Sequence, residues 1–213
     1  MTARPIRVLL ADDHALLREG LRALLSNDGD LQIVGEATDG LQAVEAALDT
    51  GPDVVLMDVT LPSLNGIDAT RRITQQRPDI RVLVLTMYDD AQTVDRALRA
   101  GAKGYVVKDA GATTVAEAIR AVARGEVYLS PEVSGYVLAG YLNADAPELD
   151  PLTPREREVL QLVAEGYTSH EIADRLGVAV KTVQNQRGRV MEKLGVSTTA
   201  ALVRAAMRMG LVQ

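Results

Sequence analysis

The sequence predicts an α/β protein whose first part is a doubly wound, five-stranded parallel sheet, followed by a smaller all-α domain of four helices. Two observations lead to this fold class. Short apolar runs alternate with helical patterns over the first part of the chain, which is typical of a parallel α/β fold. After an acidic segment with two prolines, residues 143–151, only helical patterns remain, which indicates a separate domain.

Each expected strand is a short run that is apolar almost throughout, as is typical of strands covered on both faces. The runs are Ile6–Ala11, Leu31–Ala37, Val54–Met57, Val82–Thr86 and Gly104–Val107. Between them, apolar residues recur at spacings of three and four, which predicts helices. The fifth of these helices is expected at Thr113–Arg124. Right-handed crossovers should place the helices on both faces of the sheet.

Composition divides the chain into three segments. We expect a first domain at residues 1–126, a connecting segment at 127–151 and a helical domain at 152–213. A short helix is expected within the connecting segment, with Ser130 as its cap and Pro131 at its first position, where proline is well tolerated.

The helical domain opens on Thr153-Pro154-Arg155-Glu156, which is typical of a capping box with proline in the first turn. Glycines then stand where helices should end. The four helices are expected at about 154–165, 169–176, 180–194 and 197–209.

The composition excludes several kinds of protein. The chain of 213 residues contains no Cys, Trp or Phe. Without Cys there can be no disulfide, thiol catalysis or thiolate metal site. No apolar run approaches the roughly 18–20 residues that span a membrane, and the N-terminus passes directly into a strand rather than a signal peptide. We therefore expect a cytoplasmic protein.

The net charge of −6 is unevenly distributed along the chain. Residues 1–143 hold 14 Lys and Arg against 20 Asp and Glu, whereas residues 152–213 hold 9 against 6. An acidic part joined to a mildly basic part suggests that only the second meets a polyanion such as nucleic acid. Chance variation between two domains would explain the charges equally well.

Five polar side chains stand where the apolar strands end. Asp12 and Asp13 follow the first strand, and Asp58 follows the third. Thr86 ends the fourth strand, and Lys108 follows the fifth. The carboxyl ends of parallel strands meet at the edge where such folds bind ligands, so we expect these side chains to lie together. Any one of them alone would be explained as a cap or a solvated charge; five matched positions indicate a site.

Three carboxylates in one place repel one another and need a compensating cation. With oxygen donors and no Cys, Mg²⁺ fits best. The Lys108 ammonium and the Thr86 hydroxyl suit an incoming phosphoryl group, whose oxygens they would neutralise or hydrogen-bond. A carboxylate beside the metal can then act as the nucleophile and form an acyl phosphate.

These motifs resemble the receiver domain of bacterial two-component response regulators. The resemblance covers roughly residues 5–125 and rests on Asp12-Asp13, LMDVTLPSLNGIDATRRI around Asp58, VLTMY with Thr86, and GAKGYVVKD with Lys108. It implies a flavodoxin-like fold and phosphorylation of Asp58 by a partner histidine kinase. It also implies Mg²⁺ bound by Asp13, Asp58 and the backbone carbonyl of Thr60, with Asp12 acting through water.

The same resemblance implies a conformational switch. Thr86 would turn toward the phosphoryl group, and Tyr105 would swing inward. The lysine is followed by Asp109 rather than by the proline that is common in the family, so a cis peptide bond is less expected there. His14, beside the acidic pair, is expected to be positional.

Residues 152–212 resemble the four-helix LuxR-type helix-turn-helix of the same regulators. LTPREREVL, EIADRLGVAVKTV and EKLGV occur in that order. Together the two parts resemble the NarL/FixJ family. The leading hypothesis is a phosphorylation-switched transcription factor rather than a turnover enzyme. Phosphorylation would shift a two-state equilibrium toward an active state that dimerises and frees the recognition helix from the acidic receiver. The off state would dock the acidic domain on the basic one, which the sequence itself does not show.

Residues 169–194 predict a helix, a turn at Gly177 and a second helix that enters the major groove. Val183, Val190 and Leu194 mark the core face of this second helix by spacings of seven and four. The residues expected at double-stranded DNA are Lys181, Thr182, Gln184, Asn185, Arg187, Gly188 and Arg189. Of these, the amides can pair with adenine edges, while the cations and the threonine are expected at phosphates.

Two residues depart from the family pattern. Gln186 stands where the family usually has His, and Gly188 lies inside the recognition helix. A glycine there costs about 1 kcal/mol relative to alanine, and it leaves a base-facing position without a side chain. His170 is expected to be an exposed or turn residue rather than a ligand.

The last helix carries small residues on more than one face: Ala201, Val203, Ala205, Ala206 and Met207. Small residues allow close helix approach, so we predict a homodimer contact there. The alternative is that they pad the core of the domain.

Two other functions compete with a phosphorylation-switched regulator. One is a Mg²⁺-dependent phosphohydrolase with Asp58 as nucleophile, loosely similar to haloacid dehalogenases. Against it, Thr60 stands where that family has a general acid, and the helical domain would be unexplained. The other is a DNA-binding protein with a vestigial receiver, which the intact five-residue site argues against.

Overall fold

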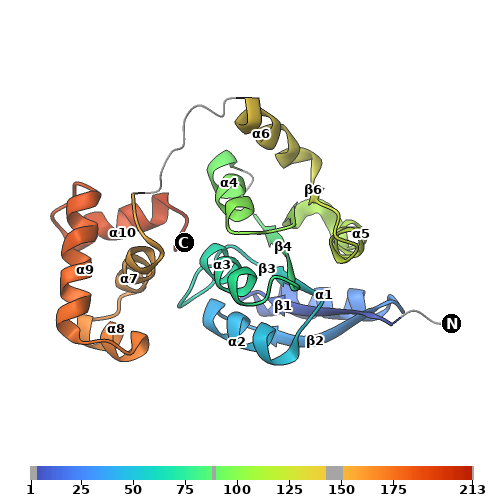
Figure 1. Cartoon of the computed structure of the whole chain (residues 1–213), viewed down its shortest axis with the longest axis horizontal. Coiled ribbons are helices and arrows are strands. Elements are labelled where there is room, and N and C mark those ends of the chain that lie inside the picture. The colour runs from blue at the N-terminus through green and yellow to red at the C-terminus, as the bar shows by residue number, and fades with distance from the viewer. Residues whose placement is uncertain (1–3, 88–89, 143–150, 213) are drawn as a thin grey trace.

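The structure, a computed structural model, describes residues 4–87, 90–142 and 151–212. Figure 1 shows an α/β unit that contains the N-terminus and a helical unit that contains the C-terminus. Among the described residues, no helix is both long and apolar enough to cross a membrane.

The α/β unit is built on a parallel sheet with the strand order β2-β1-β3-β4-β5-β6. The first five strands agree with the predicted runs, except that the fourth begins one residue earlier. The strands are β1 (Ile6–Ala11), β2 (Leu31–Ala37), β3 (Val54–Met57), β4 (Arg81–Thr86), β5 (Gly104–Val107) and β6 (Tyr128–Leu129). The expected five-stranded sheet is therefore corrected to six strands. The sixth was missed because two residues are too few to show a strand period.

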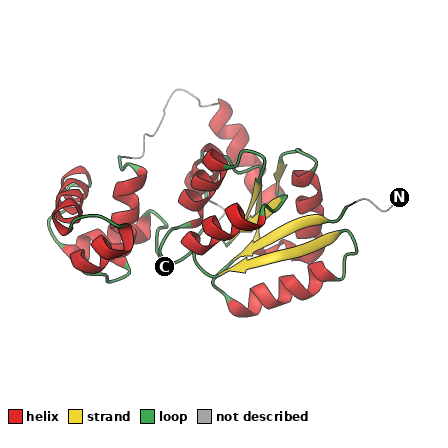
Figure 2. Cartoon of the chain, turned by 60° about the horizontal axis from the view of Figure 1, so that its bottom comes forward, coloured by secondary structure: helices red, strands yellow, loops and turns green. Residues whose placement is uncertain are grey.

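Helices cover both faces of the sheet, as Figure 2 shows. On one face lie α1 (Ala15–Ser26) and α5 (Gly111–Ala123), whose apolar residues pack on alternate residues of the strands. On the other lie α2 (Gly40–Thr50), α3 (Gly66–Gln76) and α4 (Ala91–Arg99). A 3₁₀ turn at Lys108–Ala110 joins β5 to α5. The three layers leave the carboxyl ends of the strands open at one edge.

The first part of the expected connecting segment belongs to the packed α/β unit. After β6, helix α6 (Pro131–Leu142) begins at the predicted proline and packs against α4, where Val133 is fully buried. The packed body therefore extends beyond residue 126. Most of the rest of the segment, residues 143–150, lies outside the described residues.

The helical unit contains α7 (Pro154–Ala164), α8 (Ser169–Leu176), α9 (Val180–Lys193) and α10 (Thr199–Arg208). The predicted capping box at Thr153 and Glu156 is present, and a second one at Thr168 and Glu171 begins α8. Both satisfy backbone N–H groups that have no partner within the helix. The core is formed by apolar residues of all four helices, including Val159, Ile172, Val183, Val190 and Leu202.

The two units contact each other directly. Helix α7 packs against α3 and the loop that precedes it, through side chains that include Arg157, Gln161 and Glu165. A second contact lies at the end of α10, where Arg96 of α4 donates a hydrogen bond of 2.8 Å to the carbonyl of Met209.

Candidate functional site

The sheet brings three of the predicted charges into one buried pocket. Asp12 and Asp58 are each 4% exposed, because β1 and β3 are neighbours and end side by side. Lys108 reaches across from the end of β5 and places Nζ 2.8 Å from Oδ2 of both carboxylates. One ammonium therefore holds two buried carboxylates together.

Burial and charge oppose each other in this pocket. Burial raises the pKa of the Asp58 carboxyl, and the nearby Lys108 offsets this only in part. Burial alone would lower the pKa of Lys108, but the attraction of Asp58 and hydrogen bonds to Asp12 and Asp58 outweigh it, so that the pKa is raised. The ammonium is thus firmly protonated at neutral pH and is suited to stabilising oxygen-borne negative charge.

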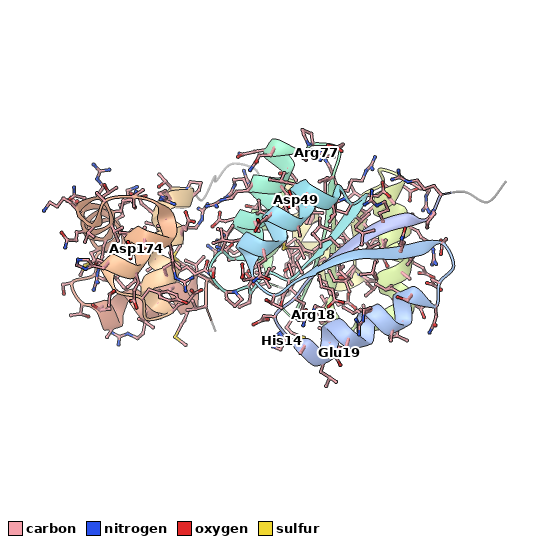
Figure 3. The ribbon with its side chains drawn as sticks, turned by 90° about the horizontal axis from the view of Figure 1, so that it is seen from below. His14, Arg18, Glu19, Asp49, Arg77 and Asp174 are labelled. Carbon is pink, nitrogen blue, oxygen red and sulfur yellow. The ribbon has the colours of Figure 1, made fainter. Side chains whose placement is uncertain are left out.

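Asp13 and His14 lie at the open side of the pocket. His14 Nδ1 is 2.9 Å from Asp13 Oδ1 and 3.3 Å from Asp12 Oδ1, and Figure 3 shows His14 at the start of α1. One ligand atom from each of Asp12, Asp13, His14 and Asp58 lies within 4.8 Å of the others. Three of these four donors are carboxylate oxygens, the ligands that Mg²⁺ prefers, so the donor set fits that ion.

The loop after Asp58 approaches the pocket with its backbone. The Thr60 amide donates a long hydrogen bond of 3.4 Å to Asp58 Oδ1. Thr60 Oγ1 is buried without a hydrogen-bond partner among the described residues. Farther along, a Cβ at Gly66 would stand 1.8 Å from the Asp58 carbonyl oxygen, so only glycine allows α3 to start this close to the acceptor strand.

The two expected switch residues are inside the α/β unit. Thr86 ends β4 and is fully buried, and so is Tyr105 of β5. The Tyr105 ring packs in an apolar cluster with Val84, Val94 and Val133. An inward swing of Tyr105 was expected on phosphorylation; in this structure the ring already lies inside.

Most of the predicted DNA-facing residues lie on the exposed side of α9. The exposed residues are Lys181, Thr182, Gln184, Asn185, Gly188 and Arg189, whereas Arg187 is half-buried. Arg187 donates a hydrogen bond to the hydroxyl of Thr199 on α10, so its guanidinium is engaged within the unit. On the opposite side, Val183 and Val190 are buried and Leu194 packs against the core, as predicted.

Helix α9 lies on the side of the helical unit away from the sheet, as Figures 1 and 2 both show. The α/β unit contacts α7 and the end of α10 instead. The expectation that the acidic domain covers the recognition helix in the off state is therefore wrong for this arrangement. The physical reason is that the interface charges come from α3 and α7, not from the basic face of α9.

The small residues of α10 are divided between two roles. Ala205 and Ala206 are buried in the domain core, whereas Met207 is 50% exposed. Ala201 and Val203 are half-buried. Packing in the domain core therefore accounts for Ala205 and Ala206. Ala201, Val203 and Met207 leave an apolar edge of α10 partly exposed.

Comparison with known families now decides what these two units are. Residues 8–120 match the response regulator receiver domain, and residues 150–206 match the luxR family of bacterial regulatory proteins. The chain is a response regulator. The first match alone covers more than half of it, and the assignment to the NarL/FixJ type is confirmed. Its domains are those of a phosphorylation-dependent transcription regulator.

Relatives match this response regulator over nearly its whole length. LiaR of Bacillus subtilis (strain 168), a transcriptional regulatory protein, is 40% identical over 194 residues, which is 90% of this chain and 92% of LiaR. NreC of Staphylococcus carnosus (strain TM300), an oxygen regulatory protein, is 36% identical over 211 residues, or 95% and 97% of the two chains. A solved complex of the response regulator RcsB with DNA is similar with a TM-score of 0.59 and 28% identity, over 96% of this chain and 98% of that one.

Sequence reasoning missed the polar residues that join the two domains of the response regulator. Asn65, Asp68, Arg157, Gln161 and Glu165 form this contact. Asn65-Gly66 has the pattern of a tight turn, and the other residues have the pattern of ordinary helix residues. The one available signal was the run of charged and amide residues on α7 that leaves no clean apolar face.

Proposed function

We propose that Asp58 is the phosphoryl acceptor of this response regulator. The observation that carries the proposal is how the pocket occupies its carboxylate oxygens. Both oxygens of Asp12 are engaged, Oδ1 by the His14 amide and Oδ2 by Lys108, each at 2.8 Å. Within the described parts of the chain, Asp58 Oδ1 receives only the long bond from Thr60. Among the four oxygens of the two buried carboxylates, Asp58 Oδ1 therefore has the weakest hydrogen bonding. This makes it a better nucleophile than the oxygens of Asp12.

The chemistry is a transfer from a phosphohistidine of a partner histidine kinase. An Asp58 oxygen forms a bond to phosphorus while the bond between phosphorus and the imidazole nitrogen breaks, and the imidazole leaves with a proton. Lys108 loses one carboxylate partner when Asp58 becomes an acyl phosphate, which is a mixed anhydride, and its ammonium can then turn to the phosphoryl oxygens. Thr86, at the end of the next strand, supplies a hydroxyl donor, and Tyr105 occupies the space behind it.

Mg²⁺ is the cation that we propose for this pocket. Asp13, Asp58 and the Thr60 carbonyl would hold it, with Asp12 acting through water. When bound, the ion neutralises phosphoryl oxygens during transfer. The protein accepts one phosphoryl group on its own side chain and, in this proposal, is not a turnover enzyme.

We propose that the exposed face of α9 reads double-stranded DNA. Gln184 and Asn185 would contact bases, and Lys181, Thr182 and Arg189 would contact phosphates. Gly188 would let the helix approach the groove closely. Arg187 is assigned to a phosphate as well, reached by exchanging its bond to Thr199. The similarity to a regulator solved with DNA supports this assignment.

In this proposal, the acceptor domain is the segment 1–126 together with β6 and α6, which pack on it. The connection follows up to residue 151, and residues 152–213 form the DNA-binding domain. Phosphorylation favours a homodimer, for which the open edge of α10 with Met207 supplies one apolar contact. A dimer sets two recognition helices about one helical turn of DNA apart. Because the target is chromosomal DNA and the donor is a kinase, we place the protein in the cytoplasm.

One experiment tests the function. The full chain and Asp58→Ala are incubated with a small phosphodonor and Mg²⁺, and dimerisation and DNA retention are measured by sedimentation and mobility shift. We expect both to increase in the wild-type chain only. Equal DNA retention by both proteins would contradict control by phosphorylation, and steady release of phosphate over many turnovers would favour a phosphohydrolase.

A further inference from the structure

The imidazole of His14 faces the acidic pocket, although much of this side chain is in contact with solvent. Its Nδ1 atom lies 2.9 Å from Asp13 Oδ1 and 3.3 Å from Asp12 Oδ1. The side chain is 52% exposed, and Figure 3 shows it where α1 begins. A ring nitrogen therefore lies among oxygen donors, on the side of the pocket that ions reach from solvent.

The backbone around His14 is held from two directions. The His14 amide donates to Asp12 Oδ1 at 2.8 Å, and the His14 carbonyl accepts from the Arg18 amide at 3.0 Å. The Arg18 guanidinium in turn donates to the Asp12 carbonyl at 2.8 Å. His14 is the N-cap of α1, yet its side chain makes no capping hydrogen bond, whereas the N-cap side chains of α2 and α3 do. The fold thus fixes the position of the residue without using its ring as a cap.

Most carboxylate oxygens of the pocket are already engaged, which identifies the atoms that are left for an ion. Lys108 pairs with Oδ2 of both Asp12 and Asp58, and the His14 amide occupies Asp12 Oδ1. Among the described residues, the donors that remain at the open side are the Asp13 carboxylate, Asp58 Oδ1 and His14 Nδ1. Two of these three donors are oxygens and one is a nitrogen.

These donors lie close enough together to share one ion. One ligand atom from each of Asp12, Asp13, His14 and Asp58 lies within 4.8 Å of the others. Ligands of one first-row ion stand about 3 Å apart when adjacent and about 4 Å apart when opposite, since each bond is about 2.1 Å long. The side chains of Asp13 and His14 are partly exposed, so small rotations about their side-chain bonds bring the donors within these distances.

The charges of the pocket also fit a divalent ion with a neutral nitrogen ligand. Asp12, Asp13 and Asp58 carry three negative charges, and Lys108 compensates one of them. One divalent cation balances the remaining two charges. A neutral imidazole adds a fourth donor without changing this balance.

A nitrogen ligand changes which ions the pocket prefers. Mg²⁺ takes oxygen ligands and gains little from imidazole. Imidazole instead suits Fe²⁺, Ni²⁺, Cu²⁺ and Zn²⁺, whose affinity for sites of mixed nitrogen and oxygen ligands generally exceeds that of ions earlier in the row. A site with three protein ligands keeps a fourth position of Zn²⁺ open, and Asp13, His14 and Asp58 supply three.

We propose that His14 is a metal ligand, which makes the acceptor pocket a site for late first-row divalent ions, with Zn²⁺ as the representative, as well as for Mg²⁺. The inference deepens the proposed function and rests on it in one respect, since Asp58 Oδ1 is both a ligand of the ion and the proposed nucleophile. A tightly held Zn²⁺ competes with Mg²⁺ for the same oxygens. Phosphorylation of Asp58 therefore depends on which of the two ions fills the pocket.

The first experiment asks whether the imidazole binds the ion or only donates a hydrogen bond to Asp13. The full-length chain is prepared without an affinity tag and with ¹⁵N-labelled histidine, and Zn²⁺ is added in steps. Because the sequence contains two histidines, His14 and His170, the nitrogen spectrum shows two rings. We expect the Nδ1 signal of His14 to move to the position of a metal-bound nitrogen at one equivalent of Zn²⁺. The ring of His170, exposed on α8, should stay unchanged.

The second experiment compares the affinities for Zn²⁺ and Mg²⁺ by calorimetry, with no phosphodonor present. Removing the nitrogen ligand in His14→Gln should weaken Zn²⁺ binding on the order of 10-fold or more, while Mg²⁺ binding should change much less. His14→Ala provides a second variant, since the ring is half-exposed and caps nothing. His170→Gln is the matched control and should leave both affinities unchanged.

Two results would overturn the proposal: an unshifted His14 ring in the presence of Zn²⁺, or equal weakening of Zn²⁺ and Mg²⁺ binding in the His14 variants. The second result would show that the ring only positions Asp13. The proposed function is checked separately by acid-labile phosphate after treatment with a small phosphodonor and Mg²⁺. Absence of that phosphate would contradict the role of Asp58 as acceptor, while the Zn²⁺ titrations would still decide whether His14 is a ligand.

Discussion

Two buried sets of ion pairs differ in what happens when a partner is removed. One is the acceptor pocket, in which Lys108 pairs with Asp12 and Asp58, the proposed acceptor. The other is the domain contact, in which Arg157 pairs with Asp68. In the pocket, Lys108 and its carboxylates directly follow strands of one sheet, so their backbones cannot move apart unless the sheet opens. In the contact, Asp68 and Arg157 belong to different domains. They can part and become solvated while both domains stay folded. The first arrangement concentrates charge for chemistry, and the second makes a contact that can be released.

The largest effect is expected where the charges cannot separate. Lys108→Ala leaves Asp12 and Asp58 buried side by side without their shared cation. Removing one partner from a buried pair costs about 3–5 kcal/mol, which should appear as lower stability of the α/β unit in urea unfolding. Lys103→Ala removes an exposed lysine just before the same strand and should be close to neutral. Equal stability of the two variants would show that the pocket does not depend on this charge.

At the domain contact, removing one partner of the ion pair should undock the two domains rather than unfold either of them. Arg157→Ala removes one of the two arginine partners of the buried Asp68 and leaves Arg71 of its own helix as the other. The loss is felt only while the domains stay docked. The cost to folding is therefore limited to the free energy of docking, at most a few kcal/mol. We expect two separate unfolding transitions in calorimetry in place of coupled ones. A loss of 3–5 kcal/mol within the α/β unit itself would contradict this.

A smaller effect is expected in the recognition helix, which belongs to neither pair. A Cβ at Gly188 would meet nothing within 4 Å, so Gly188→Ala should stabilise the helical domain by about 1 kcal/mol. Its DNA affinity should change as well, because we propose that this position faces the groove. Gly20→Ala in α1 is equally open and should stabilise the other domain without any effect on DNA binding. Destabilisation by Gly188→Ala would show that the glycine has a structural role.

The smallest effect concerns the pH dependence of docking. Burial raises the pKa of Glu165, where Asp39 adds repulsion and the bond from Gln161 and the charge of Arg175 act in the opposite direction. A carboxyl whose pKa is raised in the docked state disfavours docking when ionised. Docking should therefore tighten as the pH falls from 7 toward the raised pKa.

Glu165→Gln keeps the acceptor oxygen for the Ser63 amide and removes the titration. We expect the two domains to dock more strongly at neutral pH, and docking to stay constant at pH values above the usual pKa of a carboxyl group. The measurement is the distance between one spin label on each domain as a function of pH. Asp68 has the opposite sign, because its lowered pKa makes docking weaken only when the pH falls below 3.8, its ordinary value. Glu45→Gln, at an exposed position of α2, should leave the profile unchanged.

The acceptor pocket could be predicted from sequence because the topology of the sheet determines which strand ends lie together. Once the five apolar runs are assigned to parallel strands, Asp12, Asp58 and Lys108 must meet at one edge, and they do. The capping box at Thr153 and the core face of α9 follow from equally local patterns. The sixth strand was missed because Tyr128–Leu129 is too short to carry a period.

The domain contact could not be predicted, because it depends on how two finished surfaces fit. Arg157 and Gln161 belong to a polar run on α7 that leaves no clean apolar face, but this pattern does not show that they are buried against another domain. The same limit explains the incorrect expectation for α9. The net charges of the two parts have opposite signs, but net charge does not tell which faces meet.

We propose that the phosphoryl group resides on Asp58, and mapping the modified residue tests this proposal most directly. The wild-type chain is treated with a small phosphodonor and Mg²⁺, the acyl phosphate is trapped, and the modified residue is located by tandem mass spectrometry. We expect the acyl phosphate on Asp58 alone in the wild-type chain, and no acyl phosphate in the Asp58→Ala protein. Modification of Asp12 or Asp13, or equal labelling of the Asp58→Ala protein, would contradict it.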